Sequence, residues 1–143
     1  MISIIGFLKE NGNKRMTLKA WALAAWYRFQ IKFRSREHLE KKWGVQGEES
    51  TEDIKPWQIR YSYLVAKNVN RVCGNTPWES KCLVRAWTAV TLLKEKEIPC
   101  TLYLGVGKDE NGKMVAHAWV RCGKNYVTGG DGSEYGMVAK FRN

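Results

Sequence analysis

The fold is decided by CLVRAWTAVTLLKEKEIPCTLYLGVG, residues 82–107, because the spacing of its apolar residues changes partway along. In its first part, apolar residues recur every three or four positions, which predicts a helix with a stripe of Leu83, Ala86, Val90 and Leu93. Lysines and glutamates followed by Pro99 end this helix. From residue 101 the apolar residues alternate, as in a strand. A central helix followed by strands predicts an α+β domain.

Alternating segments at residues 101–107 and 114–121 flank the linker KDENGK, whose Asn-Gly pair is a strong hairpin signal. NYVTGG (125–130) predicts a third antiparallel strand after a short Cys-Gly-Lys connection. Side chains alternate along a strand, so one face of 114–121 carries Val115, His117 and Trp119. Both faces are mostly apolar. We therefore expect the central helix to cover one face of the sheet and the N-terminal helices to cover the other.

The N-terminal half carries helical patterns. Residues 16–43 predict one or two amphipathic helices, with one face made of Leu18, Trp21, Ala22, Ala25, Phe29 and Phe33. GVQGEESTED (44–53) is polar and acidic and predicts a loop. A further helix is expected over 57–73, with a stripe of Ile59, Tyr63, Ala66, Val69 and Val72.

Length and composition favour one globular domain over residues 1–143, with a helical part (1–75) followed by the central helix and the sheet (76–143). Hydrophobic residues make up 44% of the chain and aromatic residues 12%, which is enough for one core. The N-terminus lacks the basic start and cleavage site of a secretory signal. The apolar run at 21–27 is too short to span a bilayer. We therefore expect a cytoplasmic protein without a membrane span.

The formal net charge of +10 suggests an acidic partner, such as nucleic acid, an anionic membrane surface or an acidic peptide. Much of the excess lies in residues 28–43, where a solvated basic helix face is the plainer interpretation. The four cysteines, at positions 73, 82, 100 and 122, form no CxxC pair. We therefore expect free thiols, with no disulfide framework, no metal site and no cofactor.

Cys82 and His117 are the residues best placed for chemistry. An imidazole without a partner is unfavourable in an apolar strand, and His117 lies between two alanines of such a strand. Cys82 is the one cysteine near a helix start, where free amides and the helix dipole favour a thiolate. This advantage requires that Ser80 caps the helix; a cap at Thr76 would place the thiol further inside it.

Each of the two residues alone is more often a core residue, but their joint arrangement favours catalysis. A thiolate beside an imidazole provides the nucleophile and the base of acyl transfer through a thioester. The other histidine, His38, lies in a polar segment and is expected on the surface.

Asp131 is the candidate acceptor for the second nitrogen of His117. A two-residue turn at Gly123-Lys124 pairs residue 117 with residue 130, so Asp131 is one step away and on the opposite face. A bulge at Gly129-Gly130 would turn it back. Without the bulge, Thr128 lies on the histidine face and another residue or a backbone carbonyl is the acceptor.

The segment from Cys82 to Gly130 resembles the C-terminal half of the lasso-peptide leader peptidases, cysteine proteases of a papain/transglutaminase-like fold. The resemblance rests on “CL” opening a helix, on “L-x-x-GV” before a hairpin and on “AHAWV” with a glycine turn beyond it. This chain has Glu97-Ile98-Pro99 where that family usually has a Gly-Ile-Pro turn.

The resemblance implies a catalytic triad of Cys82, His117 and Asp131. It also implies hydrolysis of a lasso-peptide precursor between leader and core, without a cofactor. The chain is too short for a fused leader-recognition domain, so it resembles the split form, in which a separate leader-recognition protein delivers the precursor. A separate lasso cyclase then closes the freed core.

Two other functions compete with this one. A transamidase would use the same thioester, because a thioester does not itself choose water over an amine. A basic nucleic-acid-binding module would account for the charge but not for the AHAW strand.

Overall fold

The computed structural model of the chain describes residues 14–74 and 82–143. Four helices and five strands lie within these ranges: α2 (Lys14–Phe33), α3 (Arg36–Glu40), β1 (Val45–Gln46), α4 (Pro56–Cys73), α5 (Cys82–Glu95), β2 (Thr101–Lys108), β3 (Met114–Cys122), β4 (Asn125–Thr128) and β5 (Gly136–Arg142). The strands form one antiparallel sheet in the order β1-β5-β2-β3-β4. The predicted α+β class, with a helical N-terminal half and a small antiparallel sheet, is confirmed.

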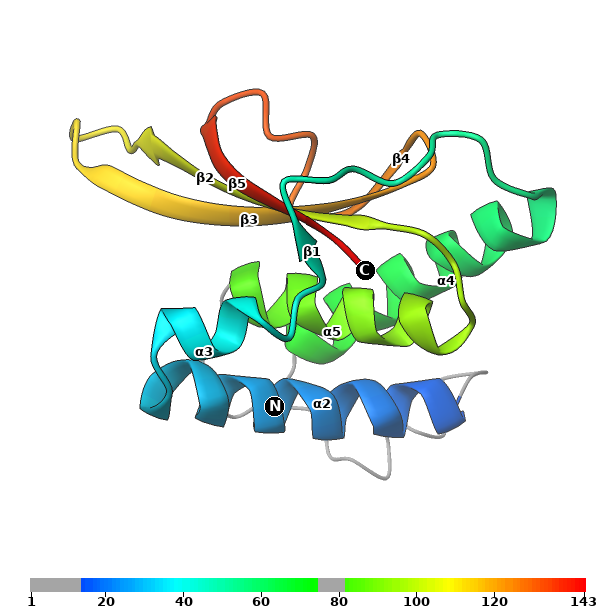
Figure 1. Cartoon of the computed structure of the whole chain (residues 1–143). Helices are drawn as coiled ribbons and strands as arrows, with labels where there is room; N and C mark the ends of the chain where they lie inside the picture. Colours follow the sequence, from blue (N-terminus) through cyan, green and yellow to red (C-terminus); the bar gives the residue numbers. More distant parts are fainter. Residues whose placement is uncertain (1–13, 75–81) are drawn as a thin grey trace.

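Helix α5 is the centre of the molecule, as its sequence predicts. It lies between the sheet and helix α2 (Figure 1). Its buried side chains point in all directions around the helix axis: Val84, Ala86, Trp87, Thr88, Ala89, Val90, Leu92 and Leu93. On the helical side, the rings of Trp87 and Tyr27 stack with centroids 3.8 Å apart. A helix that is buried on all sides organises a single core on both of its flanks.

Helix α2 buries the face opposite to the predicted one. Leu18 and Phe33 are 50% and 63% exposed, whereas Ala20 and Ala24 are fully buried. The prediction of the apolar face was wrong because this helix is apolar on both sides, and small residues allow the closer approach to α5. The buried face even accepts the polar residue Thr17, whose hydroxyl donates to Asn68 Oδ1 at 3.2 Å.

The predicted stripe of α4 is confirmed only in its C-terminal part. Val69 and Val72 are buried in the core, whereas Ile59 and Tyr63 are exposed. Pro56 begins the helix, where its fixed φ fits the first turn and its missing N–H costs nothing. No helix within residues 14–74 and 82–143 is long and apolar enough to cross a membrane.

The second face of the sheet is not covered by the N-terminal helices, which lie on the same side of the sheet as α5 (Figure 1). Instead, the segment from Glu48 to Ile54 crosses the outer face, and Tyr135 packs there from the β4–β5 loop. The expectation of two helical layers was therefore wrong. The outer face of the sheet is covered, as expected, but by irregular segments and not by helices.

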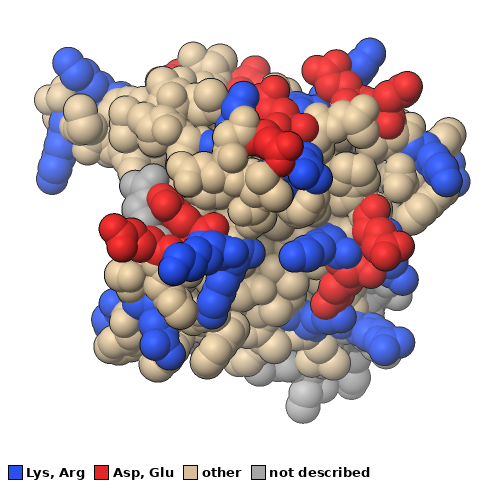
Figure 2. All heavy atoms as spheres, in the orientation of Figure 1, with Lys and Arg blue, Asp and Glu red and all other residues tan. Residues whose placement is uncertain are grey.

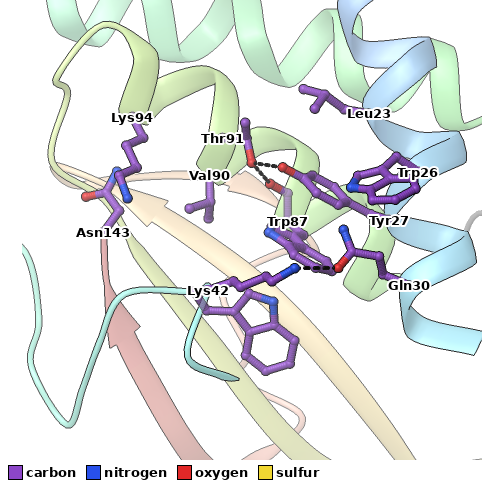
Figure 3. Close-up of a pocket in the computed structure, with 11 residues that line it drawn as sticks. Leu23, Trp26, Tyr27, Gln30, Lys42, Trp87, Val90, Thr91, Lys94 and Asn143 are labelled. Carbon is purple, nitrogen blue, oxygen red and sulfur yellow. Dashed lines mark hydrogen bonds between the residues drawn. The ribbon is translucent and has the colours of Figure 1, made fainter. Parts of the chain in front are cut away.

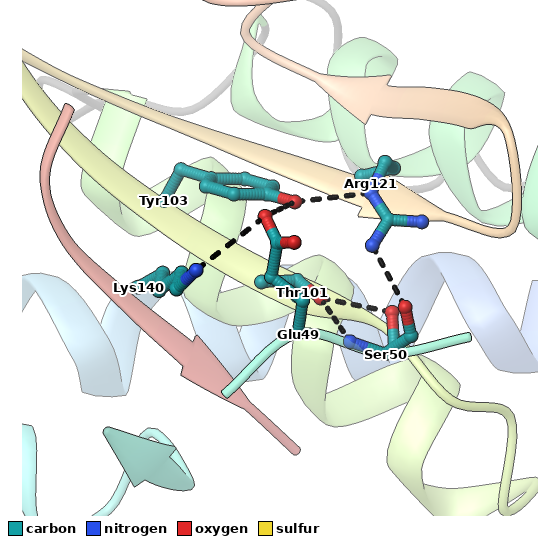
Figure 4. A network of polar contacts seen from close by, with 6 residues as sticks. All are labelled: Glu49, Ser50, Thr101, Tyr103, Arg121 and Lys140. Atoms are coloured by element: carbon teal, nitrogen blue, oxygen red, sulfur yellow. Dashed lines mark hydrogen bonds and ion pairs between the residues drawn. The ribbon is translucent and has the colours of Figure 1, made fainter. Parts of the chain in front are cut away.

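Arg121 attaches the crossing segment to the sheet (Figure 4). Its guanidinium donates to the carbonyl oxygens of Ser50, at 2.8 Å, and Gly123, and its Nε donates to the Tyr103 hydroxyl at 3.0 Å. That hydroxyl in turn donates to Glu49 Oε1 at 2.9 Å. Arg121 is only 6% exposed, so its hydrogen bonds are made in a protected environment.

We expect Arg121→Met to lower the free energy of unfolding by about 2–4 kcal/mol, because three acceptors lose a charged donor. Urea-induced unfolding measures the loss. Arg142→Met is the matched control, since Arg142 pairs with Glu48 at 3.0 Å between largely exposed side chains. This control should change the free energy by about 0.5 kcal/mol or less. Equal losses in the two variants would contradict the role of Arg121.

Candidate functional site

Cys82 is the first residue of α5 in the described part of the chain, and its side chain is half-buried. The choice between Thr76 and Ser80 as helix cap lies outside the described residues. Cys82 borders a cavity of about 240 Å³ that is formed by the start of α5, the end of α2, α3 and strands β2, β3 and β5. His117 borders the same cavity. The fold therefore brings Cys82 and His117, the two residues that the sequence singled out, to the wall of one cavity.

The wall of this cavity is mainly apolar. Besides Cys82 and His117, it consists of Ile31, Arg34, Leu39, Trp43, Leu83, Leu104, Gly105, Val106, Ala116, Ala118 and Val138. Apolar walls with few polar groups are typical of binding sites, because burial supplies affinity and the polar groups fix orientation. Sequence reasoning missed Arg34 and Trp43, which reach the cavity from the end of α2 and from the segment after α3.

The imidazole of His117 is held on the outer face of the sheet. Its Nε2 lies 2.7 Å from the carbonyl oxygen of Gly129, and its ring stacks on Tyr135 with centroids 4.4 Å apart. Trp119, on the same face, stacks at 5.9 Å. A carbonyl oxygen only accepts, so Nε2 carries a proton, and in the neutral imidazole this leaves the lone pair on Nδ1. The backbone carbonyl is thus one of the acceptors that the sequence left open.

Cys82 and His117 approach the cavity from different sides of the sheet. Cys82 packs with the core between α5 and the sheet, as Ala118 does from β3. His117 shares the opposite face with Trp119, so its ring is turned toward the 129–135 loop. Among the described residues, no hydrogen bond joins the Cys82 thiol to the imidazole. The structure places the two residues at one cavity without a hydrogen bond between their side chains.

The hairpin between β3 and β4 follows the predicted register as far as Arg121 and Tyr126. A bulge then shifts the register, so that Val120 pairs with Thr128, where β4 ends. The bulge lies before the Gly129-Gly130 pair and not within it. The chain therefore leaves the sheet after Thr128, three residues before Asp131.

Asp131 faces solvent. Its Oδ1 accepts the backbone N–H of Ser133 at 3.0 Å, and this interaction holds the pKa of the carboxyl below its usual value. The hydrogen-bond partner of His117 in the structure is Gly129, not Asp131. The fold thus brings Cys82 and His117 to the cavity and leaves the third predicted residue outside it.

The other cysteines are buried. Burial raises the pKa of Cys122 to about 11 and raises that of Cys100 further. Cys73 is 6% exposed. None of the four cysteines forms a disulfide. Cys82 alone combines partial exposure with a place on a cavity wall.

Iodoacetamide is therefore expected to label Cys82 about tenfold or more faster than Cys73, Cys100 or Cys122 near neutral pH, because alkylation needs an accessible thiolate. Mass spectrometry of proteolytic peptides after timed quenching gives the four rates. The same reaction in urea is the control, since all four thiols should then react at similar rates. Labelling of Cys82 no faster than that of Cys73 would contradict an accessible, reactive thiol.

A second cavity, of about 430 Å³, lies between α2, α5 and the chain end (Figure 3). The Tyr27 hydroxyl is 2.6 Å from Thr91 Oγ1, and Lys42 Nζ donates to Gln30 Oε1 at 2.8 Å. Trp43 borders both cavities. Among its described lining residues, this cavity has no cysteine, histidine or carboxylate side chain, so the candidate site is the cavity at Cys82.

Positive charge is not gathered in one patch on the face that Figure 2 shows, where blue and red side chains are interspersed. Several cations are paired: Lys19 Nζ lies 2.6 Å from Glu95, and Arg142 lies 3.0 Å from Glu48. Proteins that bind nucleic acid usually gather Lys and Arg in a stripe that follows the phosphates. The charge distribution on this face therefore gives little support to a nucleic-acid-binding module.

Comparison with known proteins agrees with this geometry. The sequence model of the Transglutaminase-like superfamily matches residues 17–142, a span that includes Cys82, His117 and every strand of the sheet. No curated protein and no solved structure matches the chain significantly. Members of this superfamily are typically cysteine proteases or acyl transferases, and the predicted papain/transglutaminase-like fold is confirmed. With its half-buried thiol and its strand histidine at one cavity, the chain belongs to the transglutaminase-like superfamily.

Proposed function

We propose that the protein is a cysteine peptidase that removes the leader from a ribosomally made lasso-peptide precursor. The observation that carries the proposal is the cavity shared by Cys82 and His117 in a chain of the transglutaminase-like superfamily. The leader-peptidase assignment rests on the resemblance of residues 82–130, and the thiol chemistry rests on the superfamily.

In the proposed reaction the Cys82 thiol gives its proton to Nδ1 of His117, and the sulfur attacks the scissile carbonyl carbon. The tetrahedral intermediate collapses, the C–N bond breaks and the imidazolium returns the proton to the leaving amine. Water then attacks the thioester, with the imidazole accepting its proton, and releases the carboxylate and the free thiol. The Nε2–H of His117, bonded to Gly129, leaves Nδ1 as the basic nitrogen.

This reaction requires the imidazole to reach the Cys82 sulfur. Catalytic hydrogen bonds are often long or poorly aligned in free enzymes and tighten in the substrate complex. Because the imidazole is turned toward Gly129 on the outer face of the sheet, more than such tightening is needed here. The proposal therefore includes a rearrangement of β3 around His117 on substrate binding, which turns the imidazole toward the cavity and brings Nδ1 within hydrogen-bond distance of the sulfur.

The proposed partners are the precursor, a separate leader-recognition protein and the lasso cyclase. Helix α2 offers a docking surface for them: Trp26, Phe29 and Phe33 are 54%, 48% and 63% exposed and lie on one side of the helix. The ring centroids of Trp26 and Phe29 lie 5.8 Å apart, and those of Phe29 and Phe33 lie 4.7 Å apart. Exposed apolar patches of this kind usually mark interaction sites. A tethered leader would raise the effective concentration of the scissile bond at the cavity.

Mass spectrometry of a candidate precursor, incubated with the protein with and without the leader-recognition protein, tests the function. We expect two fragments whose masses sum to the precursor plus one water, and more of them when the partner is present. Products joined to an added amine, with no hydrolysed fragment, would identify a transamidase instead. An intact precursor in all mixtures would contradict the proposal.

Asp131 belongs to the proposal as the third member of the triad, on the resemblance alone. We expect Asp131→Asn to lower turnover by about tenfold or more, because a carboxylate stabilises the imidazolium that forms during proton transfer. Asp109→Asn is the matched control, since Asp109 is an exposed carboxylate that also accepts a backbone N–H two residues on. Unchanged turnover in both variants would assign the orienting role to the carbonyl of Gly129.

A further inference from the structure

Arg34 is a cation at the cavity that holds Cys82. It follows the last turn of α2, where its backbone N–H donates to the carbonyl of Gln30 at 2.8 Å. Its side chain borders the cavity and is exposed. Within residues 14–74 and 82–143, no carboxylate pairs with its guanidinium. A guanidinium is always charged and has five N–H donors arranged to bind a carboxylate, so Arg34 is suited to pair with a carboxylate on a ligand.

The remainder of the wall sets a second requirement. Arg34 is the one cationic side chain among the described lining residues, and most of the others are aliphatic or aromatic. The cavity therefore favours a ligand with an apolar group for the wall and a carboxylate for Arg34.

The size of the cavity limits how much of the ligand it encloses. Sites that bury a whole small molecule usually measure roughly 300–1,000 Å³, whereas this one measures about 240 Å³. It suits a single side chain of a peptide that lies across the rim. A carboxylate on the adjacent residue would then reach Arg34 from solvent.

We propose that this cavity is a substrate subsite that takes one apolar side chain, and that Arg34 pairs with an acidic residue next to it in the peptide. The inference rests on the proposed function, because it names the substrate of the same thiol. Arg34 selects the substrate and takes no part in proton transfer. The net charge of +10 agrees with an acidic peptide as the ligand.

Alkylation of Cys82 by two peptide electrophiles tests the subsite. Chloroacetyl-Leu-Glu-amide and chloroacetyl-Leu-Gln-amide differ only in one charge, and both form a thioether with the cysteine sulfur as chloride leaves. We expect the Glu probe to label Cys82 about fivefold faster in the wild-type protein, as one moderate ion pair would produce. The rates come from mass spectrometry of the labelled peptide.

Two variants test whether Arg34 causes the preference for the Glu probe. Arg34→Gln should reduce the ratio of the two rates to about one. Lys32→Gln is the matched control, because Lys32 lies two residues earlier on the same exposed helix end, over the ring of Phe33, and does not border the cavity. It should keep the wild-type ratio. Equal rates for both probes in the wild-type protein, or a preference that survives Arg34→Gln, would overturn the subsite.

The outcome is independent of peptide-bond cleavage, since alkylation needs only the thiol and a bound probe. A Glu preference in a protein that never cleaves a precursor would keep the subsite and remove the peptidase. Cleavage of a precursor by a protein without that preference would do the reverse.

Discussion

Precursor cleavage is expected to disappear in both Cys82→Ala and His117→Ala, with turnover lower by a factor on the order of 10⁴ or more. The first variant lacks the sulfur that forms the thioester, and the second lacks the base that takes its proton. Cleavage is followed by mass spectrometry under conditions in which the wild-type protein completes the reaction. A folded Cys82→Ala protein that still cleaves would remove the proposed mechanism.

The controls separate chemistry from stability. His38→Ala changes the other histidine, which is exposed in α3, and should leave cleavage unchanged. Thermal unfolding of both inactive variants should stay close to the wild type, because Cys82 and His117 are only partly buried. A large loss of thermal stability in either one would explain inactivity by unfolding and would count against that residue's catalytic role.

Gly129→Ala is expected to lower the free energy of unfolding by about 3 kcal/mol, the sum of roughly 1 for the positive φ and roughly 2 for overpacking. Gly129 has φ +77°, and an added Cβ would lie in forbidden contact with the carbonyl oxygen of Ala118 and close to Trp119. The carbonyl that holds His117 must then move. We therefore also expect a loss of precursor cleavage by about 100-fold or more, measured beside thermal unfolding.

The neighbouring glycine provides the control for this variant. Gly130 has φ +75°, and an added Cβ would meet no atom within 4 Å. Gly130→Ala should therefore cost only the roughly 1 kcal/mol of the positive φ and keep most of the activity. If the two variants behaved alike, the contact between Gly129 and the β3 strand would have no special role in holding the imidazole.

The parts of the fold with the strongest patterns were predictable from the sequence. The central helix and the first hairpin follow the expected spacing of apolar residues, and the structure places α5 at Cys82–Glu95 and pairs the whole of β2 with residues 114–121 of β3. Strand β5 was missed. In its segment GMVAKFR only Phe141 is fully buried, and the other residues are exposed or half-buried. The segment therefore lacks the regular alternation of apolar and polar residues that predicts a strand.

Hydrophobicity alone could not show which face of α2 is buried. The small residues Ala20 and Ala24 pack in the core, whereas larger aromatic residues of the helix remain exposed. A helix with apolar residues on both sides leaves the choice to the shape of its partner. The same holds for the sheet, where the sequence indicated a covered outer face but not that an arginine would attach a loop there.

The site was predictable by residue type but not by geometry. Cys82 and His117 stand out in the sequence, and the fold brings both to one cavity. The position of Asp131 depends on a single bulge, and one residue of register reverses every side chain that follows. The sequence does not single out Arg34, because it is one of several arginines and lysines in the basic segment 28–43.

The strand order has a consequence for the synthesis of this protein. β5, made last, pairs with β2 on one side and with β1 on the other, so that Val45 meets Arg142. A nascent chain can form the β2–β3 hairpin early, but the opposite edge of β2 stays open until residues 136–142 leave the ribosome. Contacts between such distant parts of a chain slow folding, and an unpaired strand edge invites association with other chains. We therefore expect chains stalled before Gly136 to aggregate or to need a chaperone, whereas the released protein closes its own sheet.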